Sequence, residues 1–180
     1  MNIWYTITGG IDSNTAHQLI TWVNSQIYQG TITKLTIFIS SGGGDIDSAI
    51  RAYHFLKGLP VEVETIGISQ IDSAANTIFL AGQNRKALNG CRFFLHEGTF
   101  TIGNPSASLH SLEETLTILK ALENRNIEIV VRETGKNEQE IKNAMVDGKI
   151  LTSQEAVEFG LATEVISQLP NGPSRPSNQT

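Results

Sequence analysis

Cysteine is nearly absent from this chain of 180 residues, since Cys91 is the only one. A single cysteine cannot form an internal disulfide, and the sequence holds no Cys-x-x-Cys or Cys/His cluster typical of a metal site. Gly90 precedes Cys91 and an apolar strand follows it, so Cys91 fits a small buried hydrophobic residue better than a nucleophile. We therefore expect no metal and no cofactor.

Basic residues and long apolar runs are also scarce. Lys and Arg number 13 against 18 Asp and Glu, giving a net charge of −5. Clustered cations are needed to neutralise phosphates, so we expect no nucleic-acid partner. No uninterrupted apolar stretch approaches the roughly 18 residues of a membrane span, and Met1–Tyr5 lacks the basic and apolar segments of a signal peptide. These absences predict a soluble, cytoplasmic protein with no membrane partner.

What the chain does contain is a repeated alternation of short apolar strands with amphipathic helices. With 39% hydrophobic and 17% charged residues, its length suits one compact domain. The alternation is typical of parallel strands joined by helical crossovers, which predicts the α/β class. We expect one domain over 1–168 and a disordered tail over 169–180, where Pro, Ser, Asn and Gln replace any apolar period. The expected strands are Ile3–Ile7, Leu35–Ile39, Val61–Ile66, Arg92–Leu95 and Thr163–Ile166.

Capping and turn residues mark where the helices begin and end. Asp12 or Ser13 should begin the first helix, with Gly30 ending it, and Asp47 should begin the second. Capping boxes at Asn137/Glu140 and Thr152/Glu155 predict two later helices. Ser73–Gly82 reads as a short buried helix, and Asn89–Gly90 as a hairpin-type turn into the strand that follows.

A long helix is predicted from Leu109 to near Gly135, after a loop over 97–108. Its apolar positions recur at helical spacing, and about 25 residues span nearly 40 Å. That length exceeds what the core of one small domain covers. Part of this helix should therefore project toward another subunit.

Ser73 and His96 are the candidate nucleophile and base. Ser73 lies where strand-like sequence passes through a turn led by Gly67 into a helix of small residues, and His96 follows the strand Arg92–Leu95. A serine hydroxyl needs a neighbouring imidazole to accept its proton as it attacks a carbonyl. The plainer interpretations are a helix N-cap for Ser73 and a hydrogen-bonded strand-end residue for His96.

Three glycines end an apolar strand upstream, in Ser40-Ser41-Gly42-Gly43-Gly44-Asp45. Successive glycines let backbone N–H groups approach a ligand closely, where they can stabilise a developing oxyanion. A turn without catalytic duty is the alternative interpretation. Three glycines are entropically costly for a simple turn, which favours close approach to a ligand.

The order of these blocks, followed by Leu151-Thr152-Ser153-Gln154-Glu155-Ala156-Val157-Glu158-Phe159-Gly160-Leu161, resembles the proteolytic subunit of the Clp protease (ClpP). The resemblance covers about Ile3 to Ile166. It implies a ClpP/crotonase-like superhelix of ββα units and a serine endopeptidase. It also implies subunits assembled as heptameric or stacked double rings around a chamber, with an AAA+ unfoldase ATPase as possible partner. The helix from Leu109 matches the family's projecting handle helix.

Carried over to this sequence, the resemblance implies Ser73 as nucleophile and His96 as general base. It also implies Gly43 and Ala74 as the two backbone donors of the oxyanion hole. The family's orienting aspartate falls on Gly148, one position from Asp147. A loop can absorb a shift of one residue, so Asp147 is our candidate third member, with a Ser-His dyad as the alternative. Asp147-Gly148 is also a common turn pair.

Two further departures from the family pattern bear on partners and substrates. Asp72 places a charge directly before the candidate nucleophile, where the family has a small residue, so we expect it to affect substrate preference. The first predicted strand starts at once, so we expect no segment like the family's axial loops, which meet the ATPase.

Two other functions stay open from the sequence. The same fold serves crotonase-like acyl-CoA hydratases and isomerases, which polarise a thioester carbonyl without a serine nucleophile. The second alternative is a catalytically silent ring subunit that assembles with an active paralogue.

Overall fold

The computed structural model describes residues 1–30, 32–99 and 108–170. Thirteen elements follow one another within these ranges, and their order confirms the predicted α/β class. The part of the tail prediction that covers 171–180, and the loop prediction over 100–107, lie outside the described residues. The elements are β1 (Asn2–Thr8), α1 (Ser13–Gln29), β2 (Lys34–Ser41), α2 (Ile46–Lys57), β3 (Glu62–Asp72), α3 (Ala74–Phe79), β4 (Asn84–Leu88), β5 (Arg92–Leu95), α4 (Leu109–Thr134), α5 (Glu138–Val146), β6 (Lys149–Leu151), α6 (Ser153–Phe159) and β7 (Glu164–Ile166).

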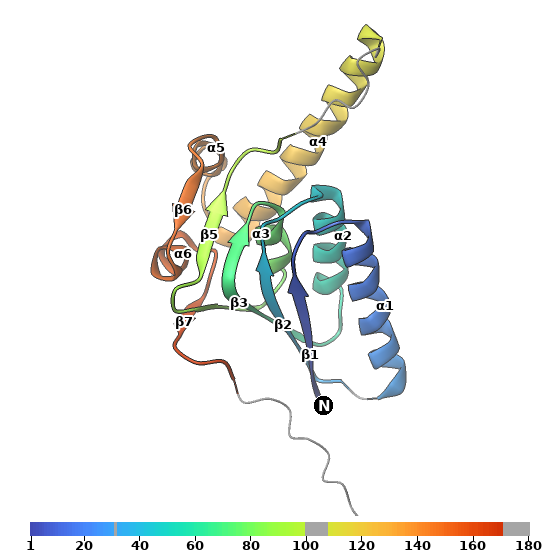
Figure 1. Ribbon diagram of the computed structural model, residues 1–180, viewed down its shortest axis with the longest axis vertical. Helices are drawn as coiled ribbons and strands as arrows, with labels where there is room; N and C mark the ends of the chain where they lie inside the picture. The colour runs from blue at the N-terminus through green and yellow to red at the C-terminus, as the bar shows by residue number, and fades with distance from the viewer. Residues whose placement is uncertain (31, 100–107, 171–180) are drawn as a thin grey trace, which may run out of the picture.

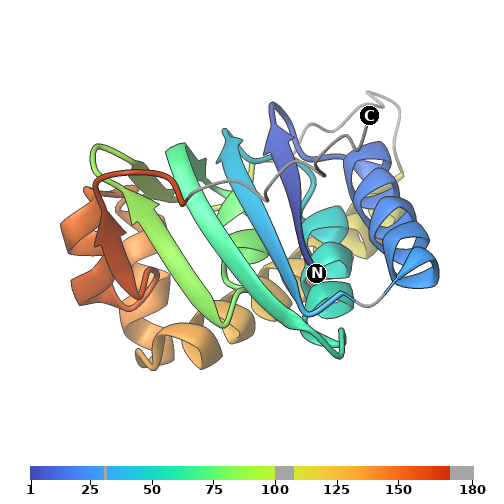
Figure 2. The ribbon, with the colours of Figure 1, turned by 90° about the horizontal axis from the view of Figure 1, so that it is seen from below.

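A mostly parallel sheet forms the centre of the molecule. Its main path runs β1-β2-β3-β4-β7, with every neighbouring pair parallel. Figure 2 shows α1 and α2 against one side of this sheet, where their apolar stripes meet the strands. The sequences of strands buried in this way are nearly continuous apolar runs, as in β2 from Leu35 to Ile39.

Strand β3 organises the site because it has two different partners on one side. Glu64–Gly67 pair with β4, and Gln70–Asp72 pair with β5, both in parallel. The predicted turn at Gly67 is therefore wrong, since the strand continues through it. Gly67 is required for packing instead: a Cβ there would lie 2.9 Å from the Cys91 Sγ.

The predicted hairpin at Asn89–Gly90 is also wrong. Strands β4 and β5 flank this turn, but each pairs with β3, and they form no ladder with each other. The local turn chemistry is genuine, because Gly90 has φ +88°. The two strands form no hairpin because each of them pairs with the buried edge of β3.

Most predicted helix ends are confirmed by their caps. The Asp12 side chain accepts from the Thr15 N–H at 2.7 Å, and the helix it begins ends at Gly30. Thr152 and Glu155 form the reciprocal capping box. The second helix begins at Ile46, because Asp45 rather than Asp47 accepts from the Ser48 N–H.

Helix α4 projects beyond the rest of the molecule, as Figure 1 shows. Its buried residues lie only in the C-terminal half, at Ile127, Ile129 and Val130. In the other half Leu109 is 74% exposed and Leu116 is 52% exposed. The apolar side chains of this half are therefore left uncovered by the rest of the described chain. Within the described part of the chain, no helix has the length and apolar character needed to cross a bilayer.

Candidate active site

Ser73 and His96 line one cavity of about 550 Å³. Five parts of the fold meet around it: the glycines after β2, the start of α3, the end of β5 with the residues that follow it, one stripe of α4 and Met145 of α5. Figure 1 shows how these elements lie in the fold. The α4 stripe has helical spacing and is formed by Leu119, Leu122, Glu123, Asn126 and Val130. Sequence reasoning placed the two candidate catalytic residues in one site, and the fold brings both to this cavity.

Ser73 occupies a sharp turn between β3 and α3. Its φ of 54° and ψ of −127° make it the single non-glycine residue with positive φ in the described ranges. Such a conformation costs about 1–3 kcal/mol and is held only where the surroundings fix it. One of the fixing contacts is the Ser73 N–H, which donates to the Phe94 carbonyl at 2.8 Å.

His96 follows β5, and its ring is held on two sides. The ring stacks on Phe94 with centroids 4.7 Å apart, and Nδ1 lies 2.6 Å from the Glu97 carbonyl oxygen. A carbonyl can only accept, so in the neutral imidazole Nδ1 carries the proton and Nε2 keeps its lone pair. Over the residues that the structure describes, no hydrogen bond joins this ring to the Ser73 hydroxyl. Such contacts often tighten only when substrate is bound.

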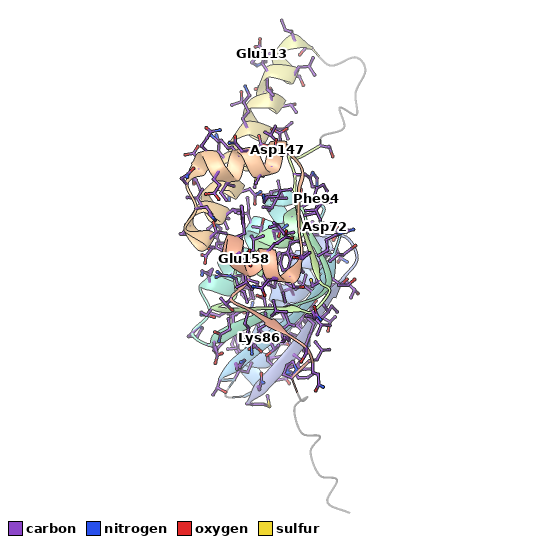
Figure 3. All side chains as sticks on the ribbon, turned by 90° about the vertical axis from the view of Figure 1, so that its left-hand side faces the viewer. Asp72, Lys86, Phe94, Glu113, Asp147 and Glu158 are labelled. Carbon is purple, nitrogen blue, oxygen red and sulfur yellow. The ribbon has the colours of Figure 1, made fainter. Side chains whose placement is uncertain are left out.

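Asp147 ends α5, and its side chain is exposed. It is not among the described residues that line the cavity, and none of their hydrogen bonds links it to His96. The last turn of α5 lies close to the histidine, because the Glu97 N–H donates to the Met145 carbonyl at 3.2 Å. Figure 3 labels Asp147 on α5 and Phe94 on the neighbouring β5. The structure thus unites two members of the predicted triad and leaves the third outside.

The glycine turn corrects the prediction for Gly43. Its N–H donates to the Ser41 Oγ at 3.1 Å, and that hydroxyl donates to the Gly9 carbonyl at 2.6 Å. The amide of Gly43 is therefore already engaged. Gly44 lines the cavity, and its N–H has no partner among the described residues. The sequence shows three adjacent glycine amides. The hydrogen bond to the Ser41 side chain determines which of them is left free at the cavity.

Ala74 supplies the other free amide. It lines the cavity beside Ser73, and in the described part of the chain its N–H has no partner. Gly43 lies so close to this turn that a Cβ on it would be 2.6 Å from the Ser73 Cβ and 3.1 Å from the Ala74 nitrogen. Two N–H groups without a partner among the described residues, those of Gly44 and Ala74, thus belong to residues that line the same cavity as Ser73.

Comparison with known proteins identifies the family. The family model described as Clp protease matches residues 4–169. The chain belongs to the Clp protease family. The resemblance seen in the sequence is thereby confirmed.

Relatives within the family are distant in sequence. The chain is 27% identical over 139 residues to "ATP-dependent Clp protease proteolytic subunit 2" of Thermobifida fusca (strain YX), covering 76% of this chain and 67% of that protein. It is 28% identical over 162 residues to subunit 1 of the same organism, covering 87% and 70%. A solved structure of a ClpP1 mutant from Listeria monocytogenes superposes with a TM-score of 0.81 at 22% identity, over 92% of this chain and 91% of that one. This superposition confirms the predicted ClpP-like fold.

One residue of this Clp-family site was missed from the sequence. Asn76 lines the cavity and is 1% exposed, and its Nδ2 donates to the Ser73 carbonyl at 3.1 Å and to the Phe94 carbonyl at 2.9 Å. The available signal was a lone asparagine in a short helix of apolar and small residues, one turn after the candidate nucleophile. Polar side chains in such helices need a buried partner.

Asp72 does not line the cavity with the other described residues. Its carboxylate is buried behind the nucleophile turn and pairs with Arg92 at 2.6 Å. Figure 3 labels Asp72 near Phe94 of β5. The other reactive group nearby is Cys91, where burial raises the pKa of the thiol to about 12. A thiol of this kind stays protonated, which suits its structural role.

Proposed function

We propose that the chain is a Clp-type serine endopeptidase that cleaves unfolded proteins or peptides through an acyl-enzyme. The observation that carries this proposal is the shared cavity. A strained serine borders it, with a histidine whose Nε2 and two residues whose backbone N–H groups have no partner in the described part of the chain. Membership of the Clp protease family supports the same reaction.

In the proposed reaction the Ser73 Oγ attacks the carbonyl carbon of the scissile peptide. His96 accepts the hydroxyl proton at Nε2 and returns it to the nitrogen of the leaving amine. The N–H groups of Gly44 and Ala74 donate to the oxyanion as it forms, and loss of one such donor typically costs about 3 kcal/mol. Water then attacks the acyl ester, with His96 again as base, and Ser73 is regenerated.

Two groups are candidates for the role of orienting the His96 ring. The sequence predicts the Asp147 carboxylate, and the last turn of α5, which Asp147 ends, contacts Glu97 through the Met145 carbonyl. The Glu97 carbonyl already holds Nδ1 in the tautomer that a base requires. Asp147→Asn separates them: a fall of about 10²-fold or more in kcat with unchanged assembly assigns the role to Asp147, and an unchanged kcat assigns it to the Glu97 carbonyl.

Assembly into rings, heptameric or stacked in pairs, is part of the proposal. The exposed apolar half of α4 supports a contact between subunits, because Leu109, Leu116 and Ile118 are each more than half exposed. The relatives are named as subunits of an ATP-dependent protease, which supports an AAA+ unfoldase as partner. These relatives are also proteolytic subunits, which favours the peptidase over the acyl-CoA alternative.

Ser73→Ala tests the function. Removing the nucleophile should reduce hydrolysis of a fluorogenic peptide to background while the assembled mass stays unchanged. Ser69→Ala is the matched control, because Ser69 lies on β3 just before the Ser73 turn, is exposed and does not line the cavity. A wild-type chain that assembles but hydrolyses no more peptide than Ser73→Ala would instead assign the silent-subunit role.

A further inference from the structure

Asn76 connects the strand that carries the nucleophile to the strand that carries the base. Its Nδ2 donates to the Ser73 carbonyl at 3.1 Å and to the Phe94 carbonyl at 2.9 Å. Phe94 lies two residues before His96, and its carbonyl also accepts from the Ser73 N–H at 2.8 Å. One amide group thus reaches both halves of the candidate catalytic pair.

The orientation of this amide follows from its partners. Both groups around Nδ2 are carbonyl oxygens, which can only accept. The reversed orientation would place Oδ1 against two acceptors, so the amide has one favourable position. Oδ1 is then buried and has no partner among the described residues. A side chain with a purely structural role would rarely leave a buried acceptor without a hydrogen bond. A side chain that fixes the geometry of a functional site can keep such an unpaired acceptor.

The Ser73 conformation explains what the amide is needed for. A non-glycine residue at φ 54° persists only when surrounding contacts over-determine it. The contacts on the Ser73 backbone are the Phe94 carbonyl on its N–H and, on its carbonyl, the Asn76 N–H at 3.0 Å together with Nδ2. Asn76 provides two of these three contacts. Asn76→Ala keeps the backbone N–H on the Ser73 carbonyl and removes the Nδ2 contact, which is the one that also ties this carbonyl to the Phe94 carbonyl.

We propose that Asn76 is a positioning residue, which holds the Ser73 turn at a fixed distance from His96 by bridging the Ser73 and Phe94 carbonyls. This inference rests on the proposed peptidase function. It assigns Asn76 no contact with substrate, so substrate binding should be independent of it. The chemical step, which needs the hydroxyl within reach of Nε2, should depend on it strongly.

Asn76→Ala tests the proposal, with Ser153→Ala as matched control. Ser153 is also buried, and its Oγ lies within hydrogen-bond distance of two carbonyl oxygens, that of Leu88 at 2.8 Å and that of Cys91 at 2.9 Å, but it does not line the cavity. We expect kcat to fall 10- to 100-fold in Asn76→Ala with KM changed less than threefold. A fluorophosphonate probe should label Ser73 more slowly by a similar factor. Ser153→Ala should lower the melting temperature but keep kcat within twofold of wild type.

Two results would overturn the inference. One is a kcat and labelling rate in Asn76→Ala within twofold of wild type. The other is a loss of kcat in Ser153→Ala as large as that in Asn76→Ala, because the effect would then follow stability alone. Failure of the proposed function looks different: the wild type itself would match Ser73→Ala in hydrolysis and would not be labelled. That result removes the basis of the inference as well.

Discussion

Replacing Gly43 by alanine should slow peptide hydrolysis about 100-fold while leaving the chain folded. An added Cβ would lie 2.6 Å from the Ser73 Cβ and 2.7 Å from the Asp72 carbonyl oxygen. Relief to an ordinary contact near 3.4 Å requires the nucleophile turn to move by about 0.8 Å. A misplacement of about 1 Å in a catalytic group costs on the order of 10²-fold in rate, which corresponds to about 2.7 kcal/mol of activation free energy.

Gly90→Ala separates this steric effect from backbone strain. Gly90 and Gly43 share a φ of +88°, but nothing lies within 4 Å of a Cβ built at Gly90. Both substitutions therefore carry the same penalty of about 1–2 kcal/mol for a left-handed alanine, and both should lower the melting temperature by about 5 °C. Only Gly43→Ala should lose activity.

The assay is steady-state hydrolysis of a fluorogenic peptide, measured beside thermal unfolding for both variants. A Gly43→Ala protein with more than half of the wild-type kcat/KM would refute the close packing of the glycine turn on Ser73. An equal loss of rate in Gly90→Ala would show that strain, rather than displacement of the nucleophile, determines the activity.

Three further outcomes are expected. The described cavity lining holds Asp45 and Glu123 and no Lys or Arg, so peptides with Glu before the scissile bond should be cleaved more slowly than those with Lys. Glu123→Gln should narrow this ratio of cleavage rates about fivefold, and a ratio that moves equally in Glu128→Gln, on the exposed face of α4, would refute the assignment. Burial acts to raise the pKa of Glu64, but hydrogen bonds from Lys34 and Lys86 lower it overall, so its stabilisation is present near pH 7 and is lost as pH falls through the folded pKa. Glu64→Gln should thus cost about 2 kcal/mol in urea unfolding at pH 7 and little at acid pH, and a deficit independent of pH would contradict this. Leu116→Asp should reduce the assembled mass in analytical ultracentrifugation, whereas an unchanged mass would place the subunit contact elsewhere.

The elements that the sequence predicts well are those with local causes. Helix α1 begins at Asp12 and α6 ends at Gly160, because capping and left-handed glycine termination act within one turn of chain. The length of α4 follows in the same way from its apolar period and from Gly135. The sequence motifs typical of the Clp protease family could also be recognised, since each is a short run of residues.

The parts that the sequence does not predict depend on contacts between distant residues. Strand β3 passes Gly67 because β4 and β5 both pair with it, and no local signal reports those partners. The choice of Gly44 over Gly43 as a free amide depends on the Ser41 hydroxyl, which is positioned by the Gly9 carbonyl 32 residues away. Asn76 has its role because Phe94, on another strand, places a carbonyl beside it.

Site mapping of a fluorophosphonate adduct by mass spectrometry tests the central claim most directly. The account predicts one adduct, on Ser73, in the wild-type chain, and its formation should slow at least tenfold in His96→Ala, because the hydroxyl loses its proton acceptor. An adduct on another residue, or a wild-type chain that remains unlabelled while fully assembled, would contradict the assignment of Ser73 as nucleophile.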